Sequence, residues 1–202
     1  GKMRSTILTA LAVCGVSILT LGQAKVGQPA PEFAGTDING KTHRLSDYRG
    51  KIVVLEAYNF DCPFCANHYK SGAMQPLQEA TVSKGVVWLL VNSTHAGHAS
   101  YRNPQAAKKE WADNGIKATA WIDDKSGAIG KLYGMKTTPH MFVINQQGVL
   151  VYQGAIDDRA ASSGDPRTAR NYVKAAIEAL LVGKPVSTSE TKPYGCSVKY
   201  AE

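Results

Sequence analysis

Two long apolar runs mark the centre of this chain, and both predict buried β-strands. Residues 52–58 and residues 86–91 are almost continuously apolar and rich in β-branched side chains. Runs of this kind are typical of strands that are buried on both faces of a sheet. Residues 66–80, which lie between the two runs, predict a single helix. A strand, a helix and a second strand in this order favour a parallel pair of strands.

The pattern before and after this unit predicts the remaining elements. Residues 33–38 and 41–45 are expected to form a hairpin around a tight two-residue turn at Asn39-Gly40. The later segments predict a helix at 104–114, a strand at 118–122, a helix at 126–133, strands at 140–145 and 149–154, and a helix at about 168–182. This order predicts an α/β fold: a mixed central β-sheet flanked by helices, with an N-terminal β-hairpin extension and a C-terminal tail.

Composition and charge fit one globular domain preceded by a leader. The chain has 202 residues, of which 44% are hydrophobic, and its net charge is +7. The basic residues are scattered and form no Lys/Arg run, which indicates a solvated cationic surface. We therefore expect no nucleic-acid partner.

The first 24 residues have the pattern of a secretory signal. Lys2 and Arg4 precede an apolar stretch at 7–21, and small residues allow cleavage before Lys25. The stretch is short for a membrane span, which needs roughly 20 apolar residues, so an uncleaved anchor is the second interpretation. Cys14 lies inside the stretch and is interpreted as a small leader residue. We expect a periplasmic or otherwise extracytoplasmic protein that meets a membrane only if the leader is uncleaved.

The segment Cys62-Pro63-Phe64-Cys65 carries the chemistry of the chain, because it lies between the first buried strand and the predicted helix. Unpaired N–H groups and the dipole at a helix N-terminus favour a thiolate, so the pKa of such a cysteine falls to roughly 3.5–7.5. Pro63 suits the first helical turn, where its missing N–H is not needed. We expect an exposed Cys62 sulfur and a short, reducible disulfide with Cys65. The alternatives are a structural disulfide or half of a zinc site, but no second Cys-x-x-Cys exists.

Four features of the chain resemble the thioredoxin-like redoxin family, which includes TlpA/ResA-like thiol–disulfide oxidoreductases and AhpC/TSA peroxiredoxins. They are the segments at 26–33 and 45–51, the Cys62–Cys65 motif, Glu56 six residues before it, and Thr138-Pro139 before a late strand. The resemblance covers about residues 26–182. It implies a thioredoxin-like redoxin domain at 25–183, between the leader at 1–24 and the tail at 184–202.

The resemblance also implies roles for individual residues. Glu56 is expected to lie buried behind Cys65 and to accept its proton, since a buried carboxyl has a raised pKa. The sequence agrees, because Glu56 interrupts an apolar strand where an unpaired charge is unfavourable. Pro139 is expected to follow a cis peptide bond and to shape a substrate groove. Thr138, Pro63 and Phe64 are expected to line the same groove.

These assignments predict an exported thiol–disulfide oxidoreductase. Cys62 would be the nucleophile and Cys65 the resolving cysteine. The substrates would be protein disulfides or dithiols, the electron donor another protein, and no bound cofactor is required. The alternative within the family is a peroxiredoxin-like thiol peroxidase. The chain departs from the peroxiredoxin pattern Pro-x-x-x-Thr-x-x-Cys, since Leu55 stands at the Pro position and Asn59 at the Thr position.

A copper-binding thioredoxin-fold module is the non-enzyme alternative. Cys62, Cys65 and His68 are spaced along one helical face, and thiolates with imidazole suit Cu(I) or Zn²⁺. They are weak metal candidates, because His68 is better explained as a partly exposed helix residue. His140 follows Pro139 and is expected near the thiols.

Cys196 leaves an odd number of cysteines after the leader is removed, namely Cys62, Cys65 and Cys196. A free thiol outside the cytoplasm exchanges or pairs. Tyr194, Val198 and Tyr200 give the surrounding segment enough apolar surface to dock on the domain. We therefore expect Cys196 to exchange with the Cys62–Cys65 pair as a third redox cysteine, or to form an intermolecular link. The alternative is a spare thiol in a loose tail.

Overall fold

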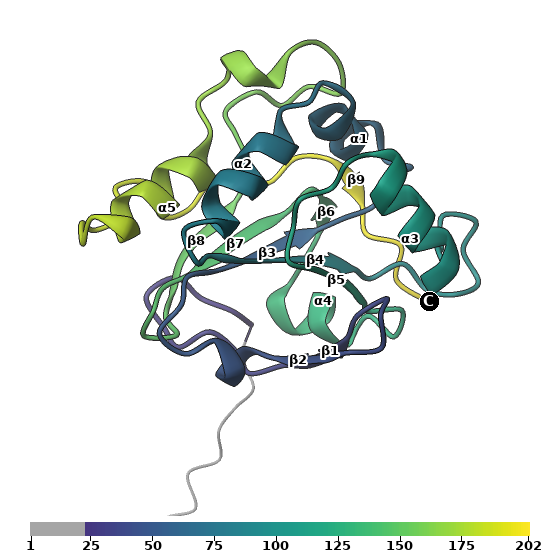
Figure 1. The fold of residues 1–202 in the computed structure, drawn as a ribbon, viewed down its shortest axis with the longest axis horizontal. Helices are drawn as coiled ribbons and strands as arrows, with labels where there is room; N and C mark the ends of the chain where they lie inside the picture. The colour runs from purple at the N-terminus through teal and green to yellow at the C-terminus, as the bar shows by residue number, and fades with distance from the viewer. Residues whose placement is uncertain (1–22) are drawn as a thin grey trace, which may run out of the picture.

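The computed structural model describes residues 23–202, and a five-stranded sheet lies at its centre (Figure 1). The strands stand in the order β5-β4-β3-β7-β8. They are β3 (Val53–Ala57), β4 (Val87–Asn92), β5 (Ala120–Asp123), β7 (Met141–Ile144) and β8 (Leu150–Gly154). β3, β4 and β5 are parallel, whereas β7 and β8 run antiparallel to their neighbours. The predicted mixed sheet and thioredoxin-like architecture are confirmed, while the predicted leader lies almost wholly outside the described residues.

Alternate side chains of the strands enter two separate hydrophobic cores. Val54, Trp88 and Met141 face one core, which is closed by α1 (Pro63–Lys70), α2 (Met74–Val82), α3 (Pro104–Asp113) and α5 (Tyr172–Leu181). Val53 and Leu55 face the other core, which is closed by α4 (Ala128–Tyr133) and the N-terminal segment. Figure 1 shows the sheet between these two layers. Successive residues of a strand point to opposite faces, so Glu56 is directed toward the layer of α1 and α2.

The N-terminal hairpin consists of β1 (Ala34–Thr36) and β2 (Thr42–Arg44), followed by the short helix η1 (Leu45–Tyr48). The predicted two-residue turn is wrong. The N–H of Asp37 donates to the carbonyl of Lys41 (2.8 Å), so residues 38–40 form a three-residue turn. Gly40 has a φ of +84° there, which glycine adopts without steric strain.

The single helix predicted at 66–80 is also wrong, because α1 and α2 are separate helices. The N–H groups of Gly72 and Ala73 donate to the carbonyls of Tyr69 and His68, the arrangement of a Schellman motif. Gly72 has a φ of +73°, the left-handed conformation that this motif requires. The final helix begins later than predicted, at Tyr172, because the side chain of Asn171 caps it by accepting from the Lys174 N–H. The 3-10 turn η2 (Pro166–Thr168) precedes it.

The C-terminal segment is docked on the domain. Its strand β9 (Cys196–Ser197) pairs antiparallel with β6 (Thr137–Thr138), and Figure 1 shows this yellow segment beside β6. β6 directly precedes Pro139, so the C-terminal segment reaches the part of the fold where the predicted site residues lie. Within the part of the chain that the structure describes, none of the helices has the length and apolar character needed to cross a bilayer.

Candidate functional site

Cys62 lies at the N-cap position of α1, directly after the loop that leaves β3. Pro63 occupies the first helical turn, and the Cys62 N–H donates to the carbonyl of Asn59 (3.1 Å). The expected exposure of the Cys62 sulfur is wrong, since only 3% of the residue is accessible to solvent. The C-terminal segment covers it, and this long-range contact is not encoded in the local sequence pattern.

The Cys62 sulfur lies between two backbone groups of the paired strands β6 and β9. Its thiol donates to the carbonyl of Thr138 (3.2 Å), and the N–H of Cys196 donates to the sulfur (3.3 Å). The Thr138–Pro139 peptide bond is cis. Cys62, Thr138, Pro139 and Cys196 therefore meet at one place, although they lie far apart in the sequence.

The environment of Cys62 favours its thiolate. Burial raises the pKa of Cys62, but hydrogen bonds with the side chains of Cys196 and Thr138 and with the backbone of Cys65 and Cys196 outweigh this effect. The net result is a pKa below the ordinary value for a cysteine. The pKa of Cys196 is raised to about 11 by burial and by its hydrogen bond to Cys62. Of these two thiols, Cys62 is therefore the one that loses its proton more readily.

Cys65 and Glu56 form a second, deeper part of the site. Cys65 is 1% exposed, and burial together with the nearby charge of Glu56 raises its pKa well above the ordinary value. Glu56 is fully buried, as its position in an apolar strand predicts. Burial raises the pKa of Glu56 to about 7, despite hydrogen bonds that favour its charged form. Such a carboxyl can take up and release a proton near neutral pH.

Three side chains that the sequence analysis did not identify hold the Glu56 carboxyl group. Its two oxygens accept from the Tyr69 hydroxyl (2.5 Å) and from the Trp88 indole N–H (2.9 Å). Gln78 in turn donates to the Tyr69 hydroxyl (3.1 Å). The signal available in the sequence was Trp88 itself, since a buried indole N–H needs an acceptor. Its partner could not be assigned, because the register of β3 against β4 is not readable from either strand alone.

The residues expected to line a substrate groove contact the chain's own C-terminal segment. The ring of Phe64 packs edge-on against Tyr194, with 6.0 Å between ring centroids. Thr138 is buried beneath the same segment, while Pro63 remains exposed. The groove next to Pro139 is therefore occupied by residues of this protein.

The histidines do not build a metal site. His68 is buried, which corrects its expected partial exposure, and its Nε2 atom lies 3.1 Å from the hydroxyl of Tyr194. His140 is also buried; its Nδ1 atom accepts from the Lys136 N–H (3.1 Å), and burial lowers its pKa to about 4. Within residues 23–202, no group of three or more His, Cys, Asp or Glu side chains is placed to hold a metal ion. The copper-binding alternative therefore receives no support from the described residues.

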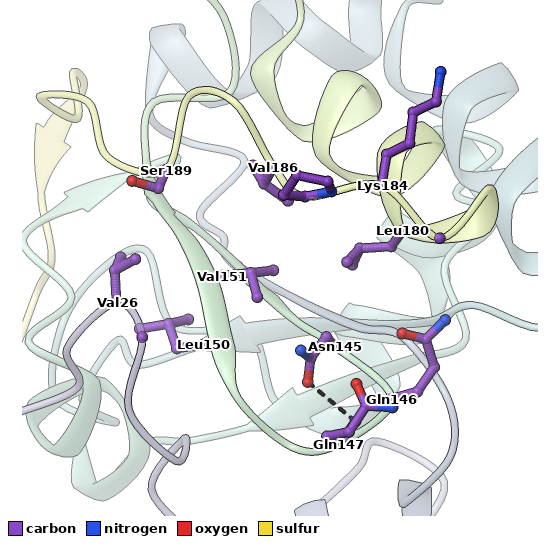
Figure 2. A pocket seen from close by; sticks show the side chains of 13 residues that line it. Val26, Asn145, Gln146, Gln147, Leu150, Val151, Leu180, Lys184, Val186 and Ser189 are labelled. Carbon is purple, nitrogen blue, oxygen red and sulfur yellow. Dashed lines mark hydrogen bonds between the residues drawn. The ribbon is translucent and has the colours of Figure 1, made fainter.

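A cleft of about 610 Å³ lies elsewhere on the molecule (Figure 2). Val26, the turn between β7 and β8, and the chain that follows α5 line it, and the Gln147 N–H donates to Asn145 beside it (3.0 Å). None of the predicted site residues borders this cleft. The cleft is therefore not assigned as the substrate site, although it is large.

Comparisons with known proteins place these features in a family. A protein-family model described as the AhpC/TSA family matches residues 26–153. The thiol-disulfide oxidoreductase ResA of Geobacillus kaustophilus is 30% identical over 152 residues, covering 72% of this chain and 82% of the relative. Peroxiredoxin-1 of Gallus gallus is 27% identical over 143 residues, covering 65% and 70%. The crystal structure of an uncharacterized conserved protein from Geobacillus kaustophilus has a TM-score of 0.78 and 29% identity, covering 88% of this chain and 93% of that protein.

Proposed function

Since the chain belongs to the AhpC/TSA family, we propose that it is an exported thiol–disulfide oxidoreductase that works through Cys62 and Cys65. The observation that carries this proposal is the contrast between the two cysteines. Cys62 has a lowered pKa at the start of a helix, whereas Cys65 has a raised pKa beside a buried carboxyl group. The first is suited to attack a disulfide and the second to resolve the product.

The proposed reaction has two exchange steps. The Cys62 thiolate attacks one sulfur of a substrate disulfide, so that a mixed disulfide forms and the other substrate sulfur leaves as a thiolate. Cys65 then gives its proton to Glu56 and attacks the Cys62 sulfur. The Cys62–Cys65 disulfide forms, the second substrate thiolate leaves, and two electrons have passed from the protein to the substrate. A pKa of about 7 for Glu56 allows this transfer near neutral pH.

Protein disulfides or dithiols are the proposed substrates. The backbone of Thr138 pairs with β9 in the structure, and it would offer the same pairing to an extended substrate chain that displaced the C-terminal segment. Pro63 and Phe64 flank this position. A partner protein would return the Cys62–Cys65 disulfide to the dithiol, and no bound cofactor takes part. The signal-like residues 1–24 are the reason for proposing an exported, periplasmic or otherwise extracytoplasmic protein, which is membrane-anchored if the leader is uncleaved.

Thiol peroxidase activity is the second candidate, because Peroxiredoxin-1 is among the relatives. In this function Cys62 would attack a peroxide and become a sulfenic acid, which Cys65 would resolve. The side chain of Asn59, at the position of the peroxiredoxin threonine, accepts from the Asp61 N–H (3.0 Å) and is used in the local turn. This use of Asn59, together with Leu55 in place of proline, favours disulfide exchange.

Reduction of insulin disulfides in the presence of dithiothreitol tests the proposal. Cys62→Ser should abolish catalysis. The double variant Cys65→Ser with Cys196→Ser, reduced and then mixed with insulin after dithiothreitol is removed, should accumulate mixed disulfides that are visible on a non-reducing gel. Ser83→Ala is the control, since Ser83 is exposed at the C-cap of α2, away from the proposed site, and the rate should be unchanged. Catalysis that survives Cys62→Ser would overturn the assignment.

A further inference from the structure

The C-terminal segment is attached to the domain on both sides of Cys196. Before Cys196, the hydroxyl of Tyr194 donates to Asp157 (2.5 Å) and lies 3.1 Å from His68. After Cys196, the Val198 N–H donates to the carbonyl of Lys136 (3.1 Å), and the Tyr200 hydroxyl donates to that of Met135 (2.7 Å). These contacts fix the position of the segment along the groove.

Two glycines show that the domain and the segment are shaped to each other. At Gly195, which has a φ of +144°, a Cβ atom would lie 2.1 Å from the carbonyl oxygen of Thr138. At Gly130, on α4, a Cβ atom would lie 2.5 Å from the Ser93 hydroxyl and 2.6 Å from the hydroxyl of Tyr200. Any other residue at position 195 would force the segment away from the backbone of Thr138, and a side chain at position 130 would disturb the seat of Tyr200. The absence of a side chain at both positions therefore permits the close approach.

β9 lies where an extended substrate would pair with the domain. Cys196 is the register partner of Thr138, and its N–H contacts the Cys62 sulfur (3.3 Å). Cys196 is partly exposed, whereas Cys62 and Cys65 are both buried. The three cysteines thus form a series from the surface to the interior, with Cys62 in the middle.

We propose that Cys196 is a third redox cysteine, which exchanges with the Cys62–Cys65 disulfide and presents the resulting disulfide to a partner protein at the surface. The proposal rests on the proposed function, since it needs a redox-active Cys62–Cys65 pair. The C-terminal segment then acts as a built-in substrate strand, and the external partner is a protein dithiol.

The exchange balances without an external oxidant. Cys196 loses its proton to solvent and attacks Cys62 of the Cys62–Cys65 disulfide; the Cys62–Cys196 bond forms, and Cys65 leaves and takes a proton from Glu56. A thiolate of the partner dithiol then attacks the Cys196 sulfur, and Cys62 leaves as a thiolate. The second partner thiolate finally releases Cys196. The protein has gained two electrons, and the partner holds a disulfide.

The properties of Cys62 suit the second step. A thiol with a low pKa is the better leaving group in disulfide exchange, and the pKa of Cys62 is lowered. Attack at Cys196 therefore expels the more stable thiolate. Attack at Cys62 itself would require the partner to reach a sulfur that the segment covers.

Disulfide mapping of the full chain tests the proposal. Trypsin leaves Cys62 and Cys65 on the peptide between Lys51 and Lys70 and places Cys196 on a separate peptide that ends at Lys199. After equilibration in glutathione redox buffers, the wild type should contain a measurable linked pair of these peptides. In Cys65→Ser, the Cys62–Cys196 link should become the main intramolecular disulfide.

A matched control moves the thiol by one residue. The double variant Cys196→Ser with Ser197→Cys keeps one cysteine on β9 but directs it to the opposite face of the strand, so the linked pair should disappear. If Cys196 remains a free thiol in every redox buffer, in both the wild type and Cys65→Ser, the proposal is overturned. Formation of the Cys62–Cys65 disulfide in the wild-type samples would leave the proposed function standing, whereas its absence from them would refute that function separately.

Discussion

Because the carboxyl group of Glu56 is buried, we expect the free energy of unfolding of this protein to fall as the pH rises toward neutrality. The pKa of Glu56 is about 7 in the folded protein against an ordinary value of 4.5. Between these two values the folded state binds more protons than the unfolded state, so the free energy of unfolding decreases with increasing pH. The stabilising effect of the protonated form is complete below pH 4.5 and is lost as the pH rises through about 7.

The size of this effect follows from the difference between the two pKa values. One pKa unit corresponds to about 1.4 kcal/mol, so the full loss is roughly 3 kcal/mol. Glu56→Gln removes the ionisation while keeping the shape of the side chain. The amide can accept from Trp88 but loses one acceptor for Tyr69, and this fixed cost does not depend on pH. The free energy of unfolding of the variant, minus that of the wild type, should therefore increase by roughly 3 kcal/mol as the pH rises from 4.5 to above 7.

Urea unfolding of both reduced proteins at several pH values between 4.5 and 7.5 measures this difference. The range avoids ionisation of Cys65, whose pKa is raised well above its ordinary value. The same variant should slow the resolution of mixed disulfides near neutral pH, because the proton acceptor is gone. Parallel stability profiles for the two proteins would show that Glu56 does not titrate in this range and would remove it from the mechanism.

Three further predictions concern the cysteines and the segment that covers them. Iodoacetamide should modify Cys62 before Cys65 in the reduced protein, with a pH midpoint below that of an ordinary cysteine, because the pKa of Cys62 is lowered; faster modification of Cys65 would reverse the assigned roles. Gly195→Val should increase the rate of Cys62 modification several-fold, since the added side chain collides with the Thr138 carbonyl, and an unchanged rate would mean that the segment does not protect Cys62. Stopped-flow measurement of peroxide consumption by the reduced protein should show slow turnover, whereas rapid turnover that survives Cys65→Ser would favour the peroxidase.

The part of the site that could be predicted from the sequence depends on local patterns. The order of strands and helices and the burial of Glu56 follow from the apolar runs. The cis bond before Pro139 followed from the resemblance to redoxins. The end of α1 is not apparent in the sequence, because its signal is one glycine, Gly72, within a segment that otherwise favours a helix. The burial of Cys62 is not apparent for another reason, because the segment that covers it lies more than 130 residues away and has no periodic pattern.

The contacts of the C-terminal segment favour exchange through Cys196 over release of the segment. Tyr194 and Tyr200 attach it before and after the cysteine, so that loosening one attachment leaves the other in place. A protein substrate that needs direct access to Cys62 would have to break both attachments and the pairing with β6. A partner that attacks Cys196 does not have to break any of these contacts, because this cysteine is already partly exposed. The arrangement that protects Cys62 from solvent therefore also determines which sulfur a protein partner can reach first.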